Sequence, residues 1–306
     1  MIEVVAPGAL TTVQDLGRPG LGALGIAESG AMDPFALIAA NRLVHNDDGA
    51  AGLEFTLVGP TLRFHADTRI AVTGSRFDAT LDGEPCAHDA TIDVHEGQIL
   101  KVGTSREGAR GYLAIAGGID VVPVMHSRSR HVAADFGSPA VARTMRLPLG
   151  AASRGPHRRV LAGAYHRYAR ERAVRFVRGP QWGAFDDQAR TVFANEPFVV
   201  STRSDRSGIR LTGPALRASE HEIDPEGVPA GAVQVPGSGE PIVLGPDRPI
   251  TGGYPKIAVA ITADLAALAQ AKPGDTLRFV ETTVEEARAA LALRRHALDD
   301  GIEDMT

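Results

Sequence analysis

The chain has 306 residues, a formal net charge of −5 and one cysteine, Cys86. This length suits about two domains, and the near-balanced charge indicates neither a nucleic-acid nor a membrane partner. A single cysteine excludes an internal disulfide framework and fits a reducing compartment. The N-terminus shows no signal-peptide pattern, and no run approaches the ~20 apolar residues of a membrane span. We therefore expect a cytoplasmic protein.

Short β-branched runs separated by glycine, proline and aspartate predict strands and turns along most of the chain. Helices are expected at few places. Residues 32–44 predict one, because Asp33 can cap it and Pro34 suits its first position. A short helix is expected to follow a Thr262 cap, and a C-terminal helix to begin where Thr283 and Glu286 stand at capping-box spacing.

Two pairs of segments repeat the order strand, turn, strand. Residues 52–64 parallel 207–218, and residues 94–103 parallel 271–280. The repeats predict two related β-barrel-like units, with chance similarity between short β-turn segments as the alternative. We expect a first β-barrel-like domain at 1–125, a connector at 126–174, a second barrel at 175–281 and a C-terminal helix at 282–306.

The connector region is rich in arginine. Residues 126–178 contain twelve arginines against Asp135 and Glu171. Such a segment could dock an acidic partner or steer an anionic substrate, but a solvated surface linker is the favoured interpretation. Nucleic-acid binding is not expected, since aromatic residues are sparse and no known motif is present.

Several common catalytic motifs are absent from the sequence. It has no P-loop, no G-x-G-x-x-G that follows a strand and opens a helix, and no G-x-S-x-G in a strand–turn–helix setting. Zinc-binding histidine spacings are also missing, so we expect no metal site. No biotinyl-lysine sequence occurs, so any activated group must come from a partner.

Two polar clusters precede the first predicted helix. In TTVQDLGRPG (11–20), Asp15 and Arg18 are close enough to pair across a turn, and a purely structural salt bridge is the alternative. In IAESGAMDP (26–34), a loop with Ser29 leads to a helix N-terminus that suits an anion. The alternative there is that Asp33 simply caps the helix.

Two further clusters lie in the second half. In STRSDRSGIRLTGP (201–214), Asp205 and Arg206 are the favoured functional candidates, because arginine can bind a carboxylate or phosphate with two hydrogen bonds. The stretch PDRPITGGYPKIAVA (246–260) uses one of only three lysines. Its candidates are Asp247, Arg248, Thr251, Gly252, Gly253, Tyr254 and Lys256. Lysine at the edge of an apolar strand could act as a cation or proton carrier, or could be an ordinary surface residue.

Five ordered motifs carry a family resemblance. They are TVQDLGRPG, SGAMDPFALIAANRLV, GYLAIAGGIDV, SDRSGIRLTGP and GEPIVLGPDRPITGGYPKIA. Together they resemble the biotin-dependent carboxyltransferase-like family, which includes the C subunit of 5-oxoprolinase (PxpC), KipA proteins and allophanate hydrolase subunit 2. The resemblance covers about residues 1–281. Two departures stand out: Pro249 and Ile250 replace the usual Gln and Thr, and His126 replaces the glycine of a GSRS turn.

The resemblance implies cyclophilin-like β-barrel domains and an enzyme subunit that is active only in a complex. In the 5-oxoprolinase complex, the C subunit works with the KipI-type B subunit and a third, lactam-opening subunit. Together they convert 5-oxoproline to glutamate with ATP. One alternative is biotin-dependent carboxyl transfer to urea or another amide, with the biotin on a partner carrier. Another is a KipA-type regulatory protein that binds a kinase inhibitor.

Roles for the candidate residues follow from this resemblance as hypotheses. Arg18 or Arg206 would hold the substrate carboxylate, and Asp15 or Asp205 would orient the arginines or accept a proton. Lys256, Tyr254 and the backbone of the two glycines at 252–253 would stabilise charge on the carbonyl oxygen or phosphate. We expect paired barrels to bring these distant groups into one crevice.

Overall fold

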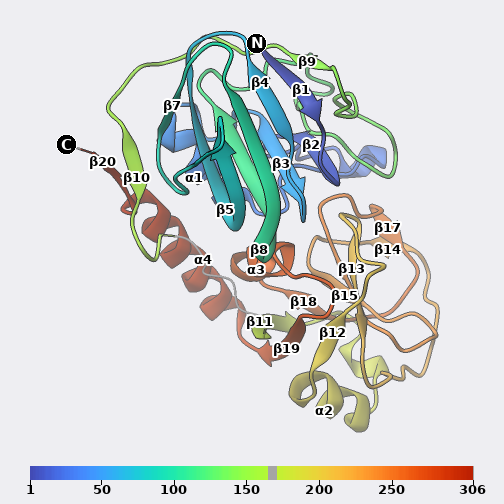
Figure 1. Ribbon diagram of the computed structural model, residues 1–306. Helices are drawn as coiled ribbons and strands as arrows, with labels where there is room; N and C mark the ends of the chain where they lie inside the picture. The colour runs from blue at the N-terminus through green and yellow to red at the C-terminus, as the bar shows by residue number, and fades with distance from the viewer. Residues whose placement is uncertain (165–170, 306) are drawn as a thin grey trace. The chain divides into compact units, whose positions relative to one another are not determined.

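The structure, a computed structural model, describes residues 1–164 and 171–305, which form two compact units (Figure 1). Unit 1 comprises residues 1–18, 29–164 and 295–305, and unit 2 comprises residues 19–28 and 171–294. Each unit has its own β-sheet and hydrophobic core. The prediction of a mainly β fold with a few short helices is confirmed.

Unit 1 is built on an open, half-barrel sheet with the strand order β2-β3-β8-β4-β1-β9. The long strand β8 pairs with β3, β4 and β5, and β5 also pairs with β6 and β7. Apolar side chains of these strands fill the core. The strands are β1 (Ile2–Ala6), β2 (Leu10–Gln14), β3 (Gly52–Thr56), β4 (Thr61–Phe64), β5 (Thr68–Leu81), β6 (Glu84–Pro85), β7 (Ile92–Val94), β8 (Ile99–Ile115) and β9 (Arg146–Leu147).

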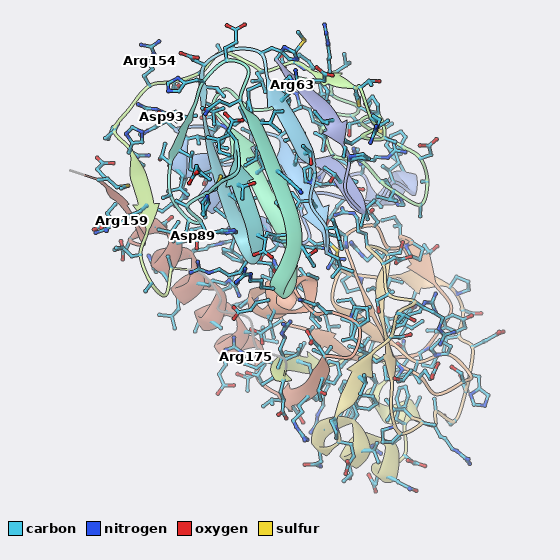
Figure 2. The ribbon with its side chains drawn as sticks, viewed as in Figure 1. Arg63, Asp89, Asp93, Arg154, Arg159 and Arg175 are labelled. Carbon is cyan, nitrogen blue, oxygen red and sulfur yellow. The ribbon has the colours of Figure 1, made fainter. Side chains whose placement is uncertain are left out.

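Helix α1 (Pro34–Leu43) packs against β5 and β8 of this sheet (Figure 1). The predicted cap is confirmed, since the Asp33 carboxylate accepts a hydrogen bond from the Ala36 amide at 3.1 Å. A small ribbon also belongs to unit 1, in which β10 (Arg158–Val160) pairs with β20 (Ile302–Asp304). Arg159, labelled in Figure 2, forms an ion pair with Glu303 across this ribbon.

Unit 2 is a closed barrel with the strand order β11-β18-β15-β16-β13-β12-β19. The parallel pair of β11 and β19 closes it. Buried and exposed residues alternate along β11, as they do in a strand with one face on a core. The barrel strands are β11 (Glu171–Arg178), β12 (Phe198–Val200), β13 (Gly208–Thr212), β15 (Ala232–Gln234), β16 (Ile242–Leu244), β18 (Lys256–Ala260) and β19 (Thr276–Glu281).

Phenylalanines dominate the core of unit 2. The rings of Phe193 and Phe279 stack with centroids 4.4 Å apart, and Phe176 and Phe198 pack around them.

A second ribbon, β14 (Glu226–Gly227) with β17 (Thr251–Gly252), lies outside the barrel order. The remaining elements are helices α2 (Asp187–Asn195), α3 (Leu265–Ala269) and α4 (Val284–Asp299), and 3-10 turns η1 (Gly22–Leu24), η2 (Trp182–Ala184) and η3 (Thr262–Asp264).

Two predicted helix starts have opposite outcomes. The capping box before α4 is confirmed, because the Glu286 amide donates to Thr283 Oγ1 at 3.1 Å and the Thr283 amide donates to Glu286 Oε2 at 3.2 Å. The Thr262 cap is wrong, since Thr262 already lies inside η3 and no side chain caps that turn. Within the described ranges, no helix has both the length and the apolar sequence that crossing a membrane requires.

Candidate functional site

Asp15 follows β2 and holds a turn that is far away in the sequence. Its carboxylate accepts hydrogen bonds from Ser127 Oγ at 2.7 Å, the Arg128 amide at 2.6 Å and Ser129 Oγ. The Gly17 amide, at 2.7 Å, is a fourth donor. A carboxylate with four donors around it is well suited to fixing a turn. A role as proton acceptor would require one of these bonds to open.

Arg18 is directed to the same turn. It is 2% exposed, its Nη2 donates to the Ser129 carbonyl oxygen at 2.5 Å, and its guanidinium lies 5.1 Å from the ring centroid of Phe136. Asp15 and Arg18 therefore meet at Ser129. Met125 and His126 lie just before this turn, with φ of 51° and 64° in the left-handed region that favours glycine. This conformation explains why glycine is common at this point in the motif.

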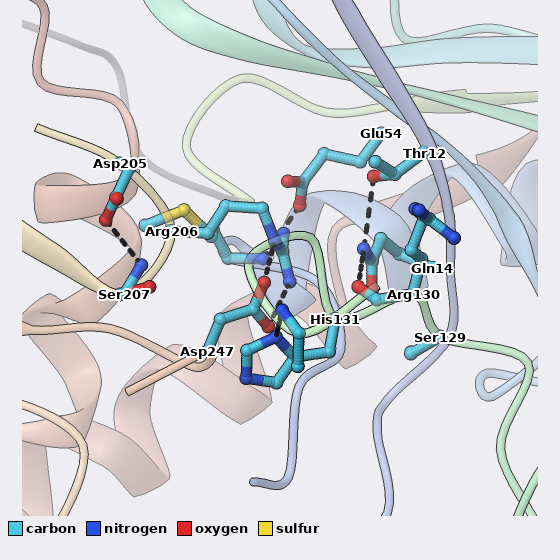
Figure 3. A network of polar contacts seen from close by, with 12 residues as sticks. Thr12, Gln14, Glu54, Ser129, Arg130, His131, Asp205, Arg206, Ser207 and Asp247 are labelled. Carbon is cyan, nitrogen blue, oxygen red and sulfur yellow. Dashed lines mark hydrogen bonds and ion pairs between the residues drawn. The ribbon is translucent and has the colours of Figure 1, made fainter. Parts of the chain in front are cut away.

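Ser29 lies beside this cluster in unit 1. The following residues contact the β2 end, because the Ala31 amide donates to the Asp15 carbonyl at 2.9 Å. Ser29 is buried with a φ of 55°, and its Oγ has no hydrogen-bond partner within the described part of the chain. Unit 1 thus brings Asp15, Arg18 and Ser29 together. Figure 3 shows the neighbouring Gln14, whose amide donates to Thr12 Oγ1.

In unit 2, Arg206 and Asp247 form a buried ion pair (Figure 3). Arg206 Nε and Nη2 contact the two carboxylate oxygens of Asp247 at 2.8 and 3.2 Å. Their side chains are 3% and 1% exposed. Two-point contacts of this kind fix both groups in orientation. The pair joins the end of the loop before β13 to the loop after β16, so it orders the segment that leads to residues 248–256.

Asp205 and Tyr254 lie closer to solvent. Asp205 Oδ1 accepts from the Ser207 and Gly208 amides at 2.8 and 3.0 Å, which is an Asx turn (Figure 3). This contact gives Asp205 a local structural role. Tyr254 is 40% exposed, and Thr251 is exposed on β17. These two hydroxyls are accessible to a ligand.

Lys256 is a buried cation at the start of β18. It is 2% exposed, and its Nζ forms an ion pair with Glu226 of β14. Gln181 joins them, since its Nε2 donates to Glu226 Oε1 at 2.7 Å and its Oε1 accepts from the Lys256 amide at 3.1 Å. The hydrogen bond from Lys256, followed by that from Gln181, lowers the pKa of the Glu226 carboxyl below its ordinary value.

A β-bulge places Gln234 opposite Lys256. Across β15 and β18 the pairing moves from Val233–Ala258 to Gln234–Lys256, which leaves one extra residue in β18. Bulges re-aim side chains and are common beside active sites. Directly paired residues on one face have Cβ atoms about 5 Å apart. Gln234 and Lys256 therefore belong to one polar cluster.

Gly252 and Arg248 complete this cluster. A Cβ at position 252 would lie 2.5 Å from Gln234 Nε2, so any side chain there would displace that amide. Arg248 is 6% exposed and donates from Nε to the Val228 carbonyl at 2.8 Å. The Gly253 carbonyl accepts from the Ile223 amide at 2.8 Å. We call the set Gln181, Glu226, Gln234, Arg248, Gly252 and Lys256 the unit 2 cluster.

The carboxyltransferase domain, subdomain A and B, matches residues 24–281 of this chain. The chain belongs to this family. It is 38% identical to the C subunit of 5-oxoprolinase from Escherichia coli (strain K12), over 95% of this chain and 94% of that protein. It is 34% identical to the corresponding 5-oxoprolinase chain of Haemophilus influenzae, over 94% and 93%.

A solved structure supports the same assignment. The K. lactis urea amidolyase structure matches with a TM-score of 0.91 and 30% identity, over 98% of this chain. The matched region is 20% of that longer protein. The family assignment thus agrees with the motif resemblance, and the relatives of both kinds are enzymes.

Three residues of the unit 2 cluster were not predicted from the sequence: Gln181, Glu226 and Gln234. Gln234 had a usable signal, because a polar residue interrupts the apolar run AVQV. Gln181 and Glu226 lie in turns and a two-residue strand, where no periodicity marks them. Among the described residues, no group of three His, Cys, Asp or Glu side chains could hold a metal ion.

The unit 2 cluster is rich in hydrogen-bond donors. It contains one ammonium, one guanidinium and two amides against a single carboxylate, Glu226. Such a set suits a ligand with acceptor oxygens, such as a carbonyl, a carboxylate or a phosphoryl group. The cluster can therefore stabilise negative charge that develops on an oxygen atom.

Proposed function

We propose that this chain is the C subunit (PxpC) of an ATP-dependent 5-oxoprolinase complex. It would act with the KipI-type B subunit and a third subunit to open the lactam of 5-oxoproline to glutamate. The observation that carries the proposal is the 38% identity with the Escherichia coli protein, which extends over nearly the whole of both chains. The urea amidolyase relatives correspond to this chain over only a small part of their length.

The chemistry of the unit 2 cluster supports a reaction at a lactam carbonyl. Water adds to the carbonyl carbon, and negative charge develops on the carbonyl oxygen as this bond forms. The bond from that carbon to the ring nitrogen then breaks, and the nitrogen takes up a proton to become the amino group of glutamate. Lys256 Nζ would donate to the carbonyl oxygen, with the Gly252–Gly253 backbone beside it. Preorganised donors of this kind each account for roughly 10²–10³ in rate.

ATP would enter through the partner subunits, because this sequence has no P-loop. ATP would supply the phosphoryl group that activates the carbonyl. The hydrogen-bond donors of the unit 2 cluster suit an oxygen of the phosphoryl group as well as an oxygen of the carbonyl. Tyr254 and Thr251 would contact the substrate from the exposed side. Asp205 and the Arg206–Asp247 pair would hold the loops of unit 2. Asp15, Arg18 and Ser29 are proposed as a separate set of candidate substrate-binding residues within unit 1.

Carboxyl transfer to urea or another amide is a second candidate. The TM-score of 0.91 with the K. lactis urea amidolyase structure favours it. This reaction would need a biotinylated carrier on a partner protein. Both reactions use donors to a carbonyl oxygen, so the substrate and the cosubstrate distinguish them.

The test is reconstitution of the complex from this chain, its KipI-type partner and the third subunit. ATP hydrolysis and glutamate formation are measured with 5-oxoproline and, separately, with urea. We expect glutamate to form only with 5-oxoproline and only when this chain is present. If all three proteins are folded and associated but 5-oxoproline drives no ATP hydrolysis, the proposal is wrong. Urea-dependent carboxylation with a biotinylated carrier would support the second candidate.

A further inference from the structure

Arg248 is a buried cation without a carboxylate partner. Its guanidinium donates from Nε to the Val228 carbonyl oxygen at 2.8 Å. Its Nη1 is buried and has no hydrogen-bond partner within the described residues. Burial lowers the pKa of the guanidinium, and Glu28 opposes this effect only through a longer-range interaction. A buried charge in this state is unfavourable unless something else compensates it.

The other buried cations of unit 2 differ from Arg248 in this respect. Arg206 contacts Asp247 at 2.8 Å, Arg172 contacts Asp275 at 3.3 Å, and Lys256 is paired with Glu226. Each of these three has a carboxylate within ion-pair distance. Arg248 has none among the residues that the structure describes. The absence of a partner is therefore specific to this arginine rather than general in the unit.

Gln234 supplies a second unsatisfied donor in unit 2. Gln234 is 5% exposed, and its Nε2 is buried without a hydrogen-bond partner in the described part of the chain. The two donors adjoin two residues that are close to each other, Val228 and Gly252. Arg248 binds the Val228 carbonyl, and a Cβ at Gly252 would lie 3.2 Å from Val228 Cγ2 and 2.5 Å from Gln234 Nε2. Two side chains that are distant in sequence thus leave donors open on either side of the contact between Val228 and Gly252.

We propose that Arg248 and Gln234 form an anion subsite that binds the carboxylate of the substrate. Arg248 (+1), Lys256 (+1), Glu226 (−1) and the more distant Glu28 (−1) sum to zero, but Glu28 forms no ion pair with Arg248, so a monoanion at the open nitrogen would be the first direct charge partner of this guanidinium among the described residues. Naming 5-oxoproline as that monoanion rests on the proposed function; the subsite itself rests on the unsatisfied donors. Gly252 has no side chain that would displace the Gln234 amide. Urea is neutral and would gain nothing from the charge of Arg248.

The subsite also changes which arginine holds the carboxylate. The sequence favoured Arg18 or Arg206 for this role. Arg206 already has Asp247 as a two-point partner in unit 2, whereas Arg18 belongs to unit 1 and donates to the Ser129 carbonyl there. Arg248 has an open guanidinium nitrogen and a neighbouring open amide. Within unit 2 it is therefore the arginine whose buried charge a substrate carboxylate would compensate.

The test compares two lactams that differ only in the carboxylate. The full chain is titrated calorimetrically with 5-oxoproline and with 2-pyrrolidinone, which is the same ring without the carboxylate. We expect 5-oxoproline to bind roughly 10- to 100-fold more tightly, because hydrogen bonds to charged groups contribute this much. Arg248→Gln and Gln234→Glu should each reduce this preference, and Arg248→Gln should leave the affinity for 2-pyrrolidinone nearly unchanged.

Arg210→Gln is the matched control, since Arg210 is exposed in the same unit. It should keep the full preference, and circular dichroism of each variant checks that it is folded. Equal affinity of the unaltered chain for both lactams, no measurable binding of 5-oxoproline, or an undiminished preference in both folded variants would overturn the subsite. If Arg248 had only a structural role, Arg248→Gln would lower the affinities for both lactams by the same factor.

This result is separable from the proposed function. Preference for the carboxylate in the isolated chain, with no ATP turnover in the reconstituted complex, would leave the subsite standing and remove the function. Turnover of 5-oxoproline by the complex, with a KM that Arg248→Gln leaves unchanged, would support the proposed function and remove the subsite.

Discussion

Replacing Asp275 with asparagine should destabilise unit 2 strongly. Asp275 lies just before β19 and forms an ion pair with Arg172 of β11, with 3.3 Å between Arg172 Nη2 and Asp275 Oδ2. The two side chains are 9% and 6% exposed, respectively. The parallel pair of β11 and β19 closes the barrel, so this contact lies at the closing seam.

The magnitude follows from the burial of both charges. Removing one partner of a buried ion pair costs about 3–5 kcal/mol, because the remaining charge stays buried without compensation. Arg172 also donates from Nη1 to the Ala267 carbonyl at 3.0 Å, and asparagine still offers an oxygen. We therefore expect a loss of about 2–4 kcal/mol in the free energy of unfolding.

The assay is urea unfolding followed by the fluorescence of Trp182. It is the single tryptophan of the chain, and its ring lies 6.0 Å from that of Phe176 on β11, so it reports on unit 2. Glu171→Gln is the matched control. Glu171 pairs with Arg278 across the same two strands, but both side chains are largely exposed, so its loss should cost at most about 1 kcal/mol. If Asp275→Asn costs no more than this control, the reasoning about burial is refuted.

Three further predictions follow from local geometry. The pKa of the Glu226 carboxyl is lowered in the folded state, so its ion pair with Lys256 stabilises the fold at pH values above 4.5, the ordinary pKa of this group. This contribution is lost as the pH falls through the folded-state pKa. Glu226→Gln should therefore flatten the acid limb of the pH–stability curve measured by urea unfolding, and an unchanged acid limb would contradict this. His126→Gly should raise the melting temperature by relieving a left-handed residue, worth about 1 kcal/mol; an unchanged melting temperature would contradict this. Gly111→Ala should destabilise unit 1 by about 1–3 kcal/mol in calorimetry, because its Cβ would lie 2.3 Å from the Phe55 ring; wild-type stability would contradict the packing argument.

Local patterns predicted the helix starts well. The Asp33 cap and the Thr283–Glu286 box depend on side chains within three residues of each other, which sequence spacing encodes directly. The Thr262 cap was wrong because the chain enters a 3-10 turn there before α3. The second repeat, residues 94–103 with 271–280, predicted strand, turn, strand for both segments, and only the first segment has that order. Residues 94–103 form the end of β7, a turn and the start of β8, whereas the turn before β19 follows α3.

The candidate site was less predictable, because its contacts join distant segments. Lys256 was conspicuous as a rare lysine, but its partner Glu226 lies thirty positions earlier in a two-residue strand. The Asx turn of Asp205 and the four donors around Asp15 depend on backbone geometry that side-chain types do not show. The expectation that Asp15, Asp205 and Lys256 share one crevice stays a prediction.

The central claim is that the unit 2 cluster stabilises charge on the carbonyl oxygen of 5-oxoproline. The most direct measurement is kcat/KM for 5-oxoproline in the reconstituted complex with Lys256→Met, beside Lys101→Met as an exposed-lysine control. We predict a decrease of roughly 10²–10³ for Lys256→Met and none for the control. Equal kcat/KM values in both folded, assembled variants would contradict the account.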